Sequence, residues 1–303
     1  MVQDFTSSAP FEAWGDKNGT LFCCNSAGYS PSKVVIKGSD YSDYLAFEWS
    51  LGTYNMHGGG GTISALIVGG AGTDYIHGSN DASAYYDEEL DGDDDPDYIY
   101  GNDGIDVING GDGDDVCEGD GGGDFMFGDD GDDEMDGGDG DDKMFGSVGN
   151  DLMWGEDGED EMDGGDFDDI MYGGDDDDWM EGASGEDIIY GEGDSDGFLD
   201  GGKDHDIIYG DGGDDTIYGN LAGGSDVDYL SGGDGDDTML GDGGDDILCG
   251  DGDADALYGE GDDDVVFGGG ALDATNNGGG GTDACENDSP VACESWVTAC
   301  PAW

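Results

Sequence analysis

An aspartate recurs at every ninth residue through most of this chain of 303 residues. The repeat at residues 137–145 reads GGDGDDKMF and follows the pattern Gly-x-x-Gly-x-Asp-x-U-x, in which U is apolar. Ten copies occupy residues 101–190, and eight more extend to Phe267 with small insertions near Gly197 and Leu221. Each copy brings carboxylates and turn carbonyls, which are oxygen ligands. Flexible oxygen-only sites suit Ca²⁺ and fit the smaller, stricter Mg²⁺ poorly.

The repeat itself predicts the elements that position these aspartates. In residues 137–145, the segment GGDGDD predicts a turn, and Lys143–Phe145 predicts a short strand with Met144 facing opposite to its two neighbours. Two copies make one coil with strands on opposite sides, and stacked coils align their turns into two ladders spaced by about 4.8 Å. A short fixed period is typical of a solenoid. The sequence therefore predicts an all-β parallel solenoid with two nonapeptides per coil.

The charge of the chain restricts what it can bind. Seventy-nine acidic residues oppose five basic ones, for a formal net charge of −74. Such a charge opposes a compact state unless cations are bound. Composition alone favours disorder or adaptation to high salt, but the strict period and the fixed place of Asp beside Gly favour a folded, cation-dependent chain. Nucleic acids and anionic membranes are excluded as expected partners because both repel this surface.

The apolar position of the repeat predicts a thin core between two sheets. Its run of methionines admits binding of a soft metal such as Cu(I), but filling of a narrow core by unbranched side chains is the favoured interpretation. Because such a core is small, Ca²⁺ binding is expected to supply much of the folding free energy. The predicted core comprises Ile108, Cys117, Met126, Met135, Met144, Met153, Met162, Met171, Met180, Ile189, Ile208, Ile217, Leu230, Met239, Leu248, Leu257 and Val266.

The residues on either side of the core position face outward and differ between alternate repeats. One face is mixed in character, whereas the other forms a nearly continuous apolar and aromatic stripe. A long exposed apolar stripe indicates an interaction surface, so we expect this face to pack on another copy of the chain or on the N-terminal segment. The predicted interface residues are Leu152, Trp154, Ile170, Tyr172, Ile188, Tyr190, Ile207, Tyr209, Ile247 and Phe267.

The nonapeptide resembles the repeat of the RTX family of calcium-binding β-roll proteins, whose consensus is GGxGxDxUx. The resemblance covers more than half of the chain. It implies a right-handed parallel β-roll in which the sixth-position Asp binds Ca²⁺ between successive coils. Carried over residue by residue, the implied ligands are Asp106, Asp115, Asp124, Asp133, Asp142, Asp151, Asp160, Asp169, Asp178, Asp187, Asp206, Asp215, Asp237, Asp246, Asp255 and Asp264, with Asp74, Asp196 and Asp228 at the start of the array or beside insertions.

The two ends of the chain differ from the repeats. We expect a small N-terminal β cap over residues 1–68, the calcium-binding β-roll over 69–268 and a C-terminal cap over 269–303. Five of the seven cysteines lie in these ends, which favours disulfides and an oxidising compartment; a zinc site is the alternative, but no paired Cys-x-x-Cys spacing supports it. The disulfide candidates are Cys23, Cys24, Cys285, Cys293 and Cys300.

Catalytic chemistry is not expected from this sequence. His57, His77 and His205 lie far apart, and no motif supports nucleophilic catalysis. No apolar run is long enough to span a membrane, and no secretory signal is visible, so an earlier cleavage or another export route is expected. The sequence predicts a secreted, non-enzymatic structural protein that assembles through Ca²⁺-loaded rolls into a fibre, sheath or matrix. The alternative is a monomeric calcium-binding adhesin or an export-associated RTX module. Asn18 begins a glycosylation sequon.

Overall fold

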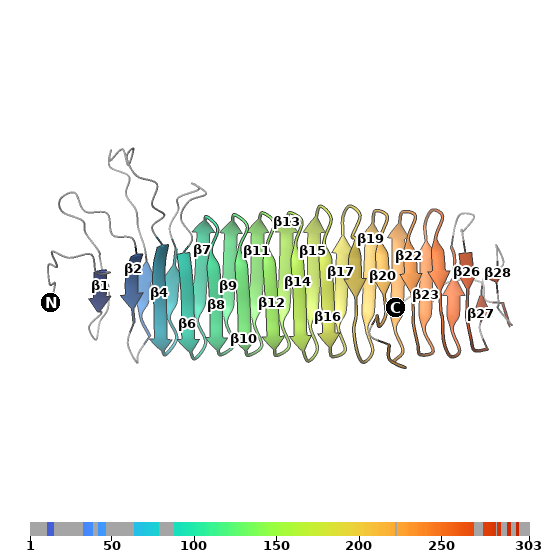
Figure 1. The fold of residues 1–303 in the computed structure, drawn as a ribbon, viewed down its shortest axis with the longest axis horizontal. Helices are drawn as coiled ribbons and strands as arrows, with labels where there is room; N and C mark the ends of the chain where they lie inside the picture. The colour runs from blue at the N-terminus through green and yellow to red at the C-terminus, as the bar shows by residue number, and fades with distance from the viewer. Residues whose placement is uncertain are drawn as a thin grey trace. The chain divides into compact units, whose positions relative to one another are not determined.

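The computed structural model describes residues 11–14, 33–38, 42–46, 64–78, 88–221, 223–269, 275–282, 284–285, 290–291 and 295–296. All regular elements in these residues are β-strands (Figure 1). The chain divides into two compact units, residues 1–148 and residues 149–303, here called the first and second units.

The first unit consists of two parallel sheets whose strands alternate along the chain. One sheet has the strand order β1-β2-β4-β6-β8-β10-β12, and the other has the order β3-β5-β7-β9-β11. The strands are β1 (Phe11–Trp14), β2 (Lys33–Lys37), β3 (Tyr44–Ala46), β4 (Ser64–Ala71), β5 (Tyr75–His77), β6 (Glu88–Asp94), β7 (Tyr98–Asp103), β8 (Val107–Asp112), β9 (Val116–Gly121), β10 (Phe125–Asp130), β11 (Glu134–Asp139) and β12 (Lys143–Val148).

The second unit repeats this construction. Its even-numbered strands β14 to β28 follow one another in one parallel sheet, and its odd-numbered strands β13 to β29 do so in the other. The strands are β13 (Leu152–Asp157), β14 (Glu161–Asp166), β15 (Ile170–Asp175), β16 (Trp179–Ser184), β17 (Ile188–Glu192), β18 (Phe198–Asp200), β19 (Ile207–Gly212), β20 (Thr216–Tyr218), β21 (Tyr229–Asp234), β22 (Thr238–Leu240), β23 (Ile247–Asp251), β24 (Ala256–Tyr258), β25 (Val265–Phe267), β26 (Thr275–Asn277), β27 (Ala284–Cys285), β28 (Pro290–Val291) and β29 (Ser295–Trp296).

The register confirms a parallel β-solenoid with two repeats per coil. Met126 pairs with Ile108 and with Met144, which are the same repeat position one coil earlier and one coil later. The insertions do not disturb this phase, because Ile208 still pairs with Ile189 and with Leu230. The extra residues lie in the turns, so alternate repeats continue to fall on opposite sheets.

The predicted division of the repeat into a six-residue turn and a three-residue strand is wrong for most coils. Residues 137–139 belong to β11, and β12 continues to Val148, so the typical strand has six residues and the turn has three. The second repeat position bends the strand through a positive φ, as at Asp129 (71°) and Ser147 (80°). These two bent residues still pair with each other, so the sheet continues past the bend.

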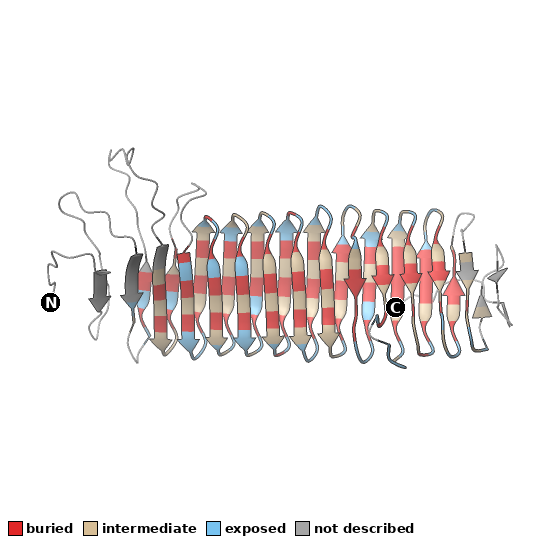
Figure 2. Ribbon diagram, viewed as in Figure 1, coloured by how far each residue is buried: buried red, intermediate tan, exposed pale blue. Residues whose placement is uncertain are grey.

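Every residue of the predicted core is fully buried, with 0 % of its surface exposed. Burial alternates residue by residue along the strands, and exposed residues gather at the turns (Figure 2). Tight packing of unbranched methionine side chains fills the space between two closely spaced sheets. The core also includes residues that were not predicted, namely Ile67, Ile76, Leu90, Ile99 and Leu199, each 0 % exposed.

The parallel register continues beyond Phe267, where the regular pattern was expected to end. Ala284 and Cys285 pair with Val265 and Val266, so the backbone of Cys285 occupies the core position of a further coil. The segment at residues 278–286 reads GGGGTDACE and is a copy of the repeat.

The described part of the chain holds two cysteines whose chemical state is defined. Cys117 is a buried thiol, and Cys249 is disulfide-bonded. Of the predicted disulfide candidates, Cys23, Cys24, Cys293 and Cys300 lie outside the described residues. No helix in the described segments has the length and apolar character needed to cross a membrane.

Candidate metal centre

The sixth-position aspartates form two columns of buried carboxylates in each unit, one at each row of turns. All nineteen predicted aspartates are at most 2 % exposed. Ionised carboxylates are rarely buried without a partner, because removing their charge from water is costly. Each buried carboxylate is therefore expected to have a partner for both of its oxygens.

The Oδ1 atom of most of these carboxylates accepts a hydrogen bond from the backbone of the preceding coil. The N–H of Asp106 donates to Asp124 Oδ1 at 2.7 Å, and in the second unit the N–H of Asp169 donates to Asp187 Oδ1 at 2.8 Å. Hydrogen bonds to an ionised acceptor are stronger than those between neutral groups. One oxygen of each aspartate is thus used to position the side chain and to join adjacent coils.

In thirteen aspartates of these columns, the Oδ2 atom is also buried but has no hydrogen-bond partner. A buried acceptor left unpaired costs about 1–3 kcal/mol, and more when it is charged. The repetition of this arrangement along both ladders indicates sites for cations. It is found at Asp74, Asp97, Asp115, Asp124, Asp169, Asp178, Asp187, Asp196, Asp206, Asp215, Asp228, Asp237 and Asp246.

Burial changes the protonation of these carboxyl groups. Removal from water raises the pKa of Asp124 to about 7, of Asp169 and Asp178 to about 8, and of Asp206 to about 9. The neighbouring carboxylates Asp187 and Asp228 add to the increase in the pKa of Asp206. Without cations, several of these groups would therefore hold a proton near neutral pH. A bound cation would favour the ionised form instead.

First-position glycines bring backbone carbonyls close to the unpaired oxygens. A Cβ atom on Gly110 would lie 2.5 Å from Asp115 Oδ2 and 2.9 Å from the carbonyl oxygen of Gly128 in the next coil. The bare glycine therefore leaves a carboxylate and a carbonyl oxygen around one small space. Within the described residues, no three His, Cys, Asp or Glu side chains are grouped to hold an ion by themselves. Backbone carbonyls would have to complete each site, and this oxygen-only donor set fits Ca²⁺.

Three residues of the carboxylate columns were not predicted. Asp97 is 1 % exposed, and its Oδ1 accepts the N–H of Asp74 at 2.6 Å. The backbone N–H of Glu88 donates to Asp106 Oδ1 at 3.1 Å, and that of Asp43 donates to Asp74 Oδ1. The signal for Asp97 was present, since residues 92–100 read GDDDPDYIY and depart from the repeat pattern only in having Asp95 in place of glycine at the fourth position.

The fifth repeat position forms a separate hydrogen-bonded ladder. Here the N–H of the later coil donates to the side chain of the earlier coil, as from Glu186 to Asp168 Oδ1 at 2.9 Å and from Asp214 to Ser195 Oγ at 2.9 Å. His205 takes the same role, because its Nδ1 accepts the N–H of Val227 at 2.8 Å. Neutral side chains suffice at this position, so it caps turns and does not require a metal.

The predicted interface residues of the second unit lie in two columns along the sheet of odd-numbered strands. Leu152, Ile170, Ile188 and Ile207 pair in succession. The rings of Trp154, Tyr172, Tyr190 and Tyr209 stack face to face, with successive centroids 6.1, 4.8 and 5.1 Å apart. Phe267 differs from the others, because only 5 % of it is exposed.

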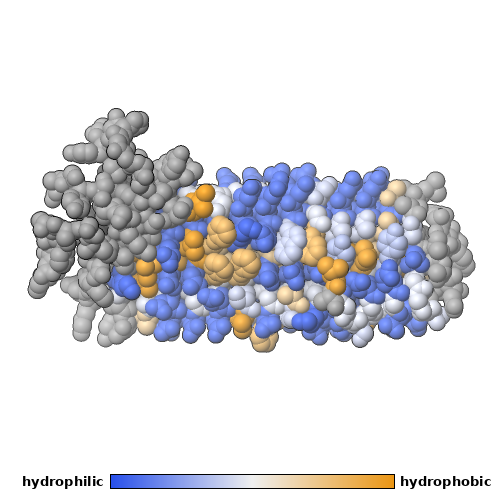
Figure 3. All heavy atoms as spheres, in the orientation of Figure 1, coloured by the Kyte–Doolittle hydropathy of each residue, from blue (hydrophilic) through white to orange (hydrophobic). Residues whose placement is uncertain are grey.

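Space-filling shows how apolar residues are placed on one face of the molecule. On that face, hydrophilic residues line both rows of turns, and hydrophobic residues lie over the middle of the strands (Figure 3). The turns and the strands thus present different chemistry to solvent.

Comparison with protein families gives a direct match to the repeats. The model of the RTX calcium-binding nonapeptide repeat matches residues 59–82, 91–126, 127–162, 163–198, 193–222 and 222–257, which together make up more than half of the chain. A search among curated proteins finds no match.

Proposed function

Because the chain belongs to the family of the RTX calcium-binding nonapeptide repeat, we propose that its sixth-position aspartates bind Ca²⁺ and that the loaded β-roll is an extracellular structural protein. In this proposal the roll is not an enzyme and assembles with copies of itself into a fibre, sheath or matrix. The calcium part and the assembly part rest on different observations and have separate tests.

The buried, unpaired Oδ2 atoms support calcium binding. With a formal net charge of −74, the folded chain also needs counter-charge at close range. Circular dichroism during a Ca²⁺ titration tests this part. We expect β structure to form as Ca²⁺ is added and to disappear with a chelator. A spectrum unchanged by Ca²⁺ would refute the calcium part.

The outer face of the odd-numbered strands in the second unit supports the proposal that copies of the chain assemble. Its aliphatic column and its ring stack run in register over successive coils, and Ile207 remains 36 % exposed. A regular apolar column of this kind suits pairing with the same face of a second copy, since side chains repeated at one spacing can interdigitate along their length.

Sedimentation and electron microscopy in excess Ca²⁺ test assembly. The variant Tyr190→Ser is expected to weaken it, because it interrupts the ring stack. Tyr258→Ser is the matched control, since Tyr258 takes the same ninth repeat position as Tyr190 but lies in a strand of the other sheet. A monomer mass independent of concentration would contradict assembly and favour the alternative, a monomeric calcium-binding adhesin or an export-associated module.

The disulfide of Cys249 supports an extracellular location, because disulfides persist mainly in oxidising compartments. Cys23, Cys24 or Cys300 would be available in this proposal to link subunits. A non-reducing gel of material purified with its thiols blocked tests the linkage. Only monomers on that gel would exclude covalent links between subunits.

A further inference from the structure

Two asparagines carry buried amide oxygens that nothing in the turn ladders explains. Apart from the sixth-position aspartates, the buried side-chain oxygens without a hydrogen-bond partner in the described segments are Asn109 Oδ1, Asn220 Oδ1 and Asp242 Oδ2. Asn109 lies in β8 at the ninth repeat position, whose side chain faces outward. Asn220 and Asp242 lie at the second repeat position, just after β20 and β22. Unpaired buried oxygens outside the ladders point to a second kind of ligand site.

In the second unit, Asn220 lies between the buried Asp200 and the half-buried Asp242, which come from the two adjacent coils. Strand β20 pairs with β18 on one side and with β22 on the other. Asp200, at the end of β18, is 5 % exposed, and its Oδ1 accepts the N–H of Leu221 at 3.2 Å. Asp242 follows β22 and contributes the unpaired Oδ2. Three successive coils thus bring Asp, Asn and Asp side chains to the same edge of one sheet.

The orientation of the Asn220 amide is defined by the inserted loop. Its Nδ2 donates to Asp226 Oδ2 at 3.4 Å, so Oδ1 points away from Asp226. A Cβ atom on Gly224 would lie 2.1 Å from Asn220 Nδ2, which shows how closely the loop covers the amide. Asn220 is only 1 % exposed. The amide oxygen is therefore kept in the interior without a donor.

The charge of Asp242 acts on the carboxyl group of Asp200. Burial, with smaller contributions from the negative charges of Glu181 and Asp242, raises the pKa of Asp200 to about 6, against the opposing effect of the hydrogen bond from Leu221. Burial also raises the pKa of Asp242. A pair of like charges in a partly buried place is unfavourable unless a cation neutralises it.

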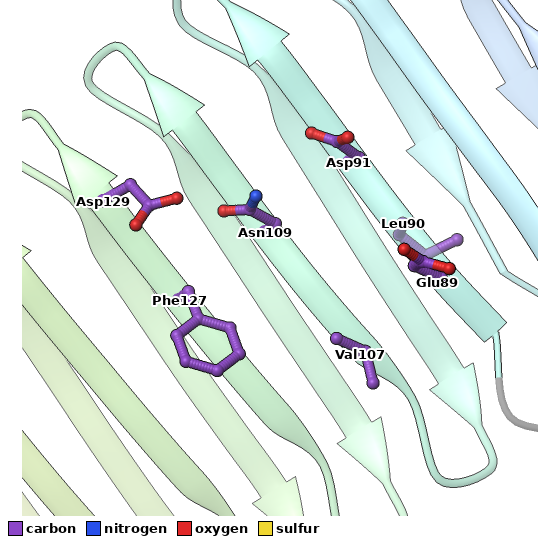
Figure 4. Close-up of a pocket in the computed structure, with 7 residues that line it drawn as sticks. All are labelled: Glu89, Leu90, Asp91, Val107, Asn109, Phe127 and Asp129. Carbon is purple, nitrogen blue, oxygen red and sulfur yellow. The ribbon is translucent and has the colours of Figure 1, made fainter.

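The first unit has a related but more open arrangement, in which the asparagine takes the ninth instead of the second repeat position and Asp129 is exposed. Asp91 in β6, Asn109 in β8 and Asp129 in β10 line a surface pocket of about 290 Å³. Figure 4 shows Asn109 between the two aspartates, with its amide oxygen on the side of Asp129. The charge of Asp129 contributes to a raised pKa of Asp91, for which burial is the largest cause.

We propose that the set of Asp200, Asn220 and Asp242 binds one divalent cation, Ca²⁺, outside the turn ladders. The two carboxylates neutralise the ion, and the amide oxygen is a third side-chain ligand, so the ligands come from three coils. A turn site, in contrast, has one such aspartate from each repeat. Flexible oxygen ligands of this type are those that Ca²⁺ accepts. The set around Asn220 would also close the loop at residues 219–228. The inference rests on the proposed calcium binding but concerns different residues.

Hydrogen exchange read by mass spectrometry tests the set around Asn220 in the full chain during a Ca²⁺ titration. The peptide covering residues 219–228 reports the loop, while circular dichroism of the same samples reports the roll. We expect Asn220→Ala and Asp242→Asn to raise the Ca²⁺ midpoint for loop protection about tenfold or more. Asp211→Asn is the matched control, because Asp211 has the same repeat position and a similar φ (65° against 67° for Asp242) on the other sheet.

The outcomes separate this site from the ladders. An unchanged loop midpoint in both variants, with the dichroism still responding to Ca²⁺, overturns the inference and leaves the calcium ladders intact. An equal shift in Asp211→Asn overturns it as well, because the effect would then be one of surface charge. If Asn220→Ala does not fold, the Ca²⁺ midpoint of Asp242→Asn alone decides the outcome. Loss of the dichroism response in the unmodified chain would instead refute the proposed function.

Discussion

The backbone N–H of Asp106 donates to Asp124 Oδ1 at 2.7 Å, while Asp124 Oδ2 is buried without a partner. The two oxygens of one carboxylate therefore have different tasks. The first joins adjacent coils in the folded chain through a hydrogen bond that does not involve a cation. The second is stabilised only by a proton or a cation.

This division predicts different effects for two substitutions of Asp124. Asp124→Asn keeps an acceptor for the N–H of Asp106 but removes the charge, so it should weaken Ca²⁺ binding with little effect on the calcium-free state in acid. Asp124→Ala also leaves that N–H unpaired, at a cost of about 1–3 kcal/mol. Denaturant unfolding with and without Ca²⁺ distinguishes them, with Asp103→Asn at an exposed position as the control. Equal losses for Asn and Ala would contradict the division.

The raised pKa values predict that the calcium-free roll is more stable in acid than at neutral pH. Asp169 and Asp206 have pKa values of about 8 and about 9 in the fold, against about 3.9 for an unfolded Asp. Between these values the folded chain binds more protons than the unfolded chain. The free energy of unfolding is therefore greatest below about pH 4, falls as the pH rises from about 4 to about 9, and levels off above the folded pKa values.

Calcium should reverse this dependence, because protons and Ca²⁺ compete for the same oxygens. With excess Ca²⁺ we expect stability to fall on acidification. Dichroism measured from pH 4 to pH 9, in chelator and in Ca²⁺, checks both signs. Parallel pH profiles under the two conditions would show that the buried carboxylates are not the calcium ligands.

Two adjacent glycines provide a test of how closely the coils stack. A Cβ atom on Gly122 would lie 1.3 Å from the carbonyl oxygen of Gly104, whereas the nearest atom to a Cβ on Gly121 is 3.8 Å away. Gly122→Ala should destabilise the fold by about 2–3 kcal/mol, since the backbone must move. Gly121→Ala should change stability by about 0.5 kcal/mol or less. Chemical unfolding in Ca²⁺ measures both, and similar losses would exclude the stacking described.

The methionine core should tolerate changes of shape better than changes of volume. Met162 is fully buried. Met162→Leu should cost less than about 1.5 kcal/mol, whereas Met162→Ala should cost about 2–5 kcal/mol because it leaves a cavity. Thermal unfolding in Ca²⁺ gives the comparison. A severe effect of Leu would indicate that the thioether has a role beyond packing.

The nine-residue period was sufficient to predict the carboxylate columns, the core and the separation of the two faces. Each depends only on the repeat position, and the insertions lie in turns where they do not change the phase. Leu199 was missed because the extra Gly197 displaces it by one residue. Asp97 was missed because Pro96, together with Asp95 at the position of the second glycine, makes this copy look interrupted.

Other features depend on conformation and could not be read from residue types. The positive φ at Ser147 allows a strand to bend and still pair, so the length of the strands was underestimated. Asn109 and Asn220 look like ordinary departures from the repeat in sequence. Their meaning depends on neighbours one coil away, and for Asn220 that separation passes through an insertion.

The fifth-position and sixth-position ladders run in opposite senses, as Glu186 to Asp168 and Asp169 to Asp187 illustrate. A repeat with an acceptor side chain at its fifth position can therefore donate one hydrogen bond and accept one hydrogen bond toward the previous coil, and do the same toward the next coil. If one whole coil were removed from a regular stretch, the turns on either side of the gap would present matching donors and acceptors to each other. The hydrogen bonds of both ladders could then form again across the junction. Duplication or deletion of an eighteen-residue block would therefore change the length of the roll while keeping the same kinds of contact between coils.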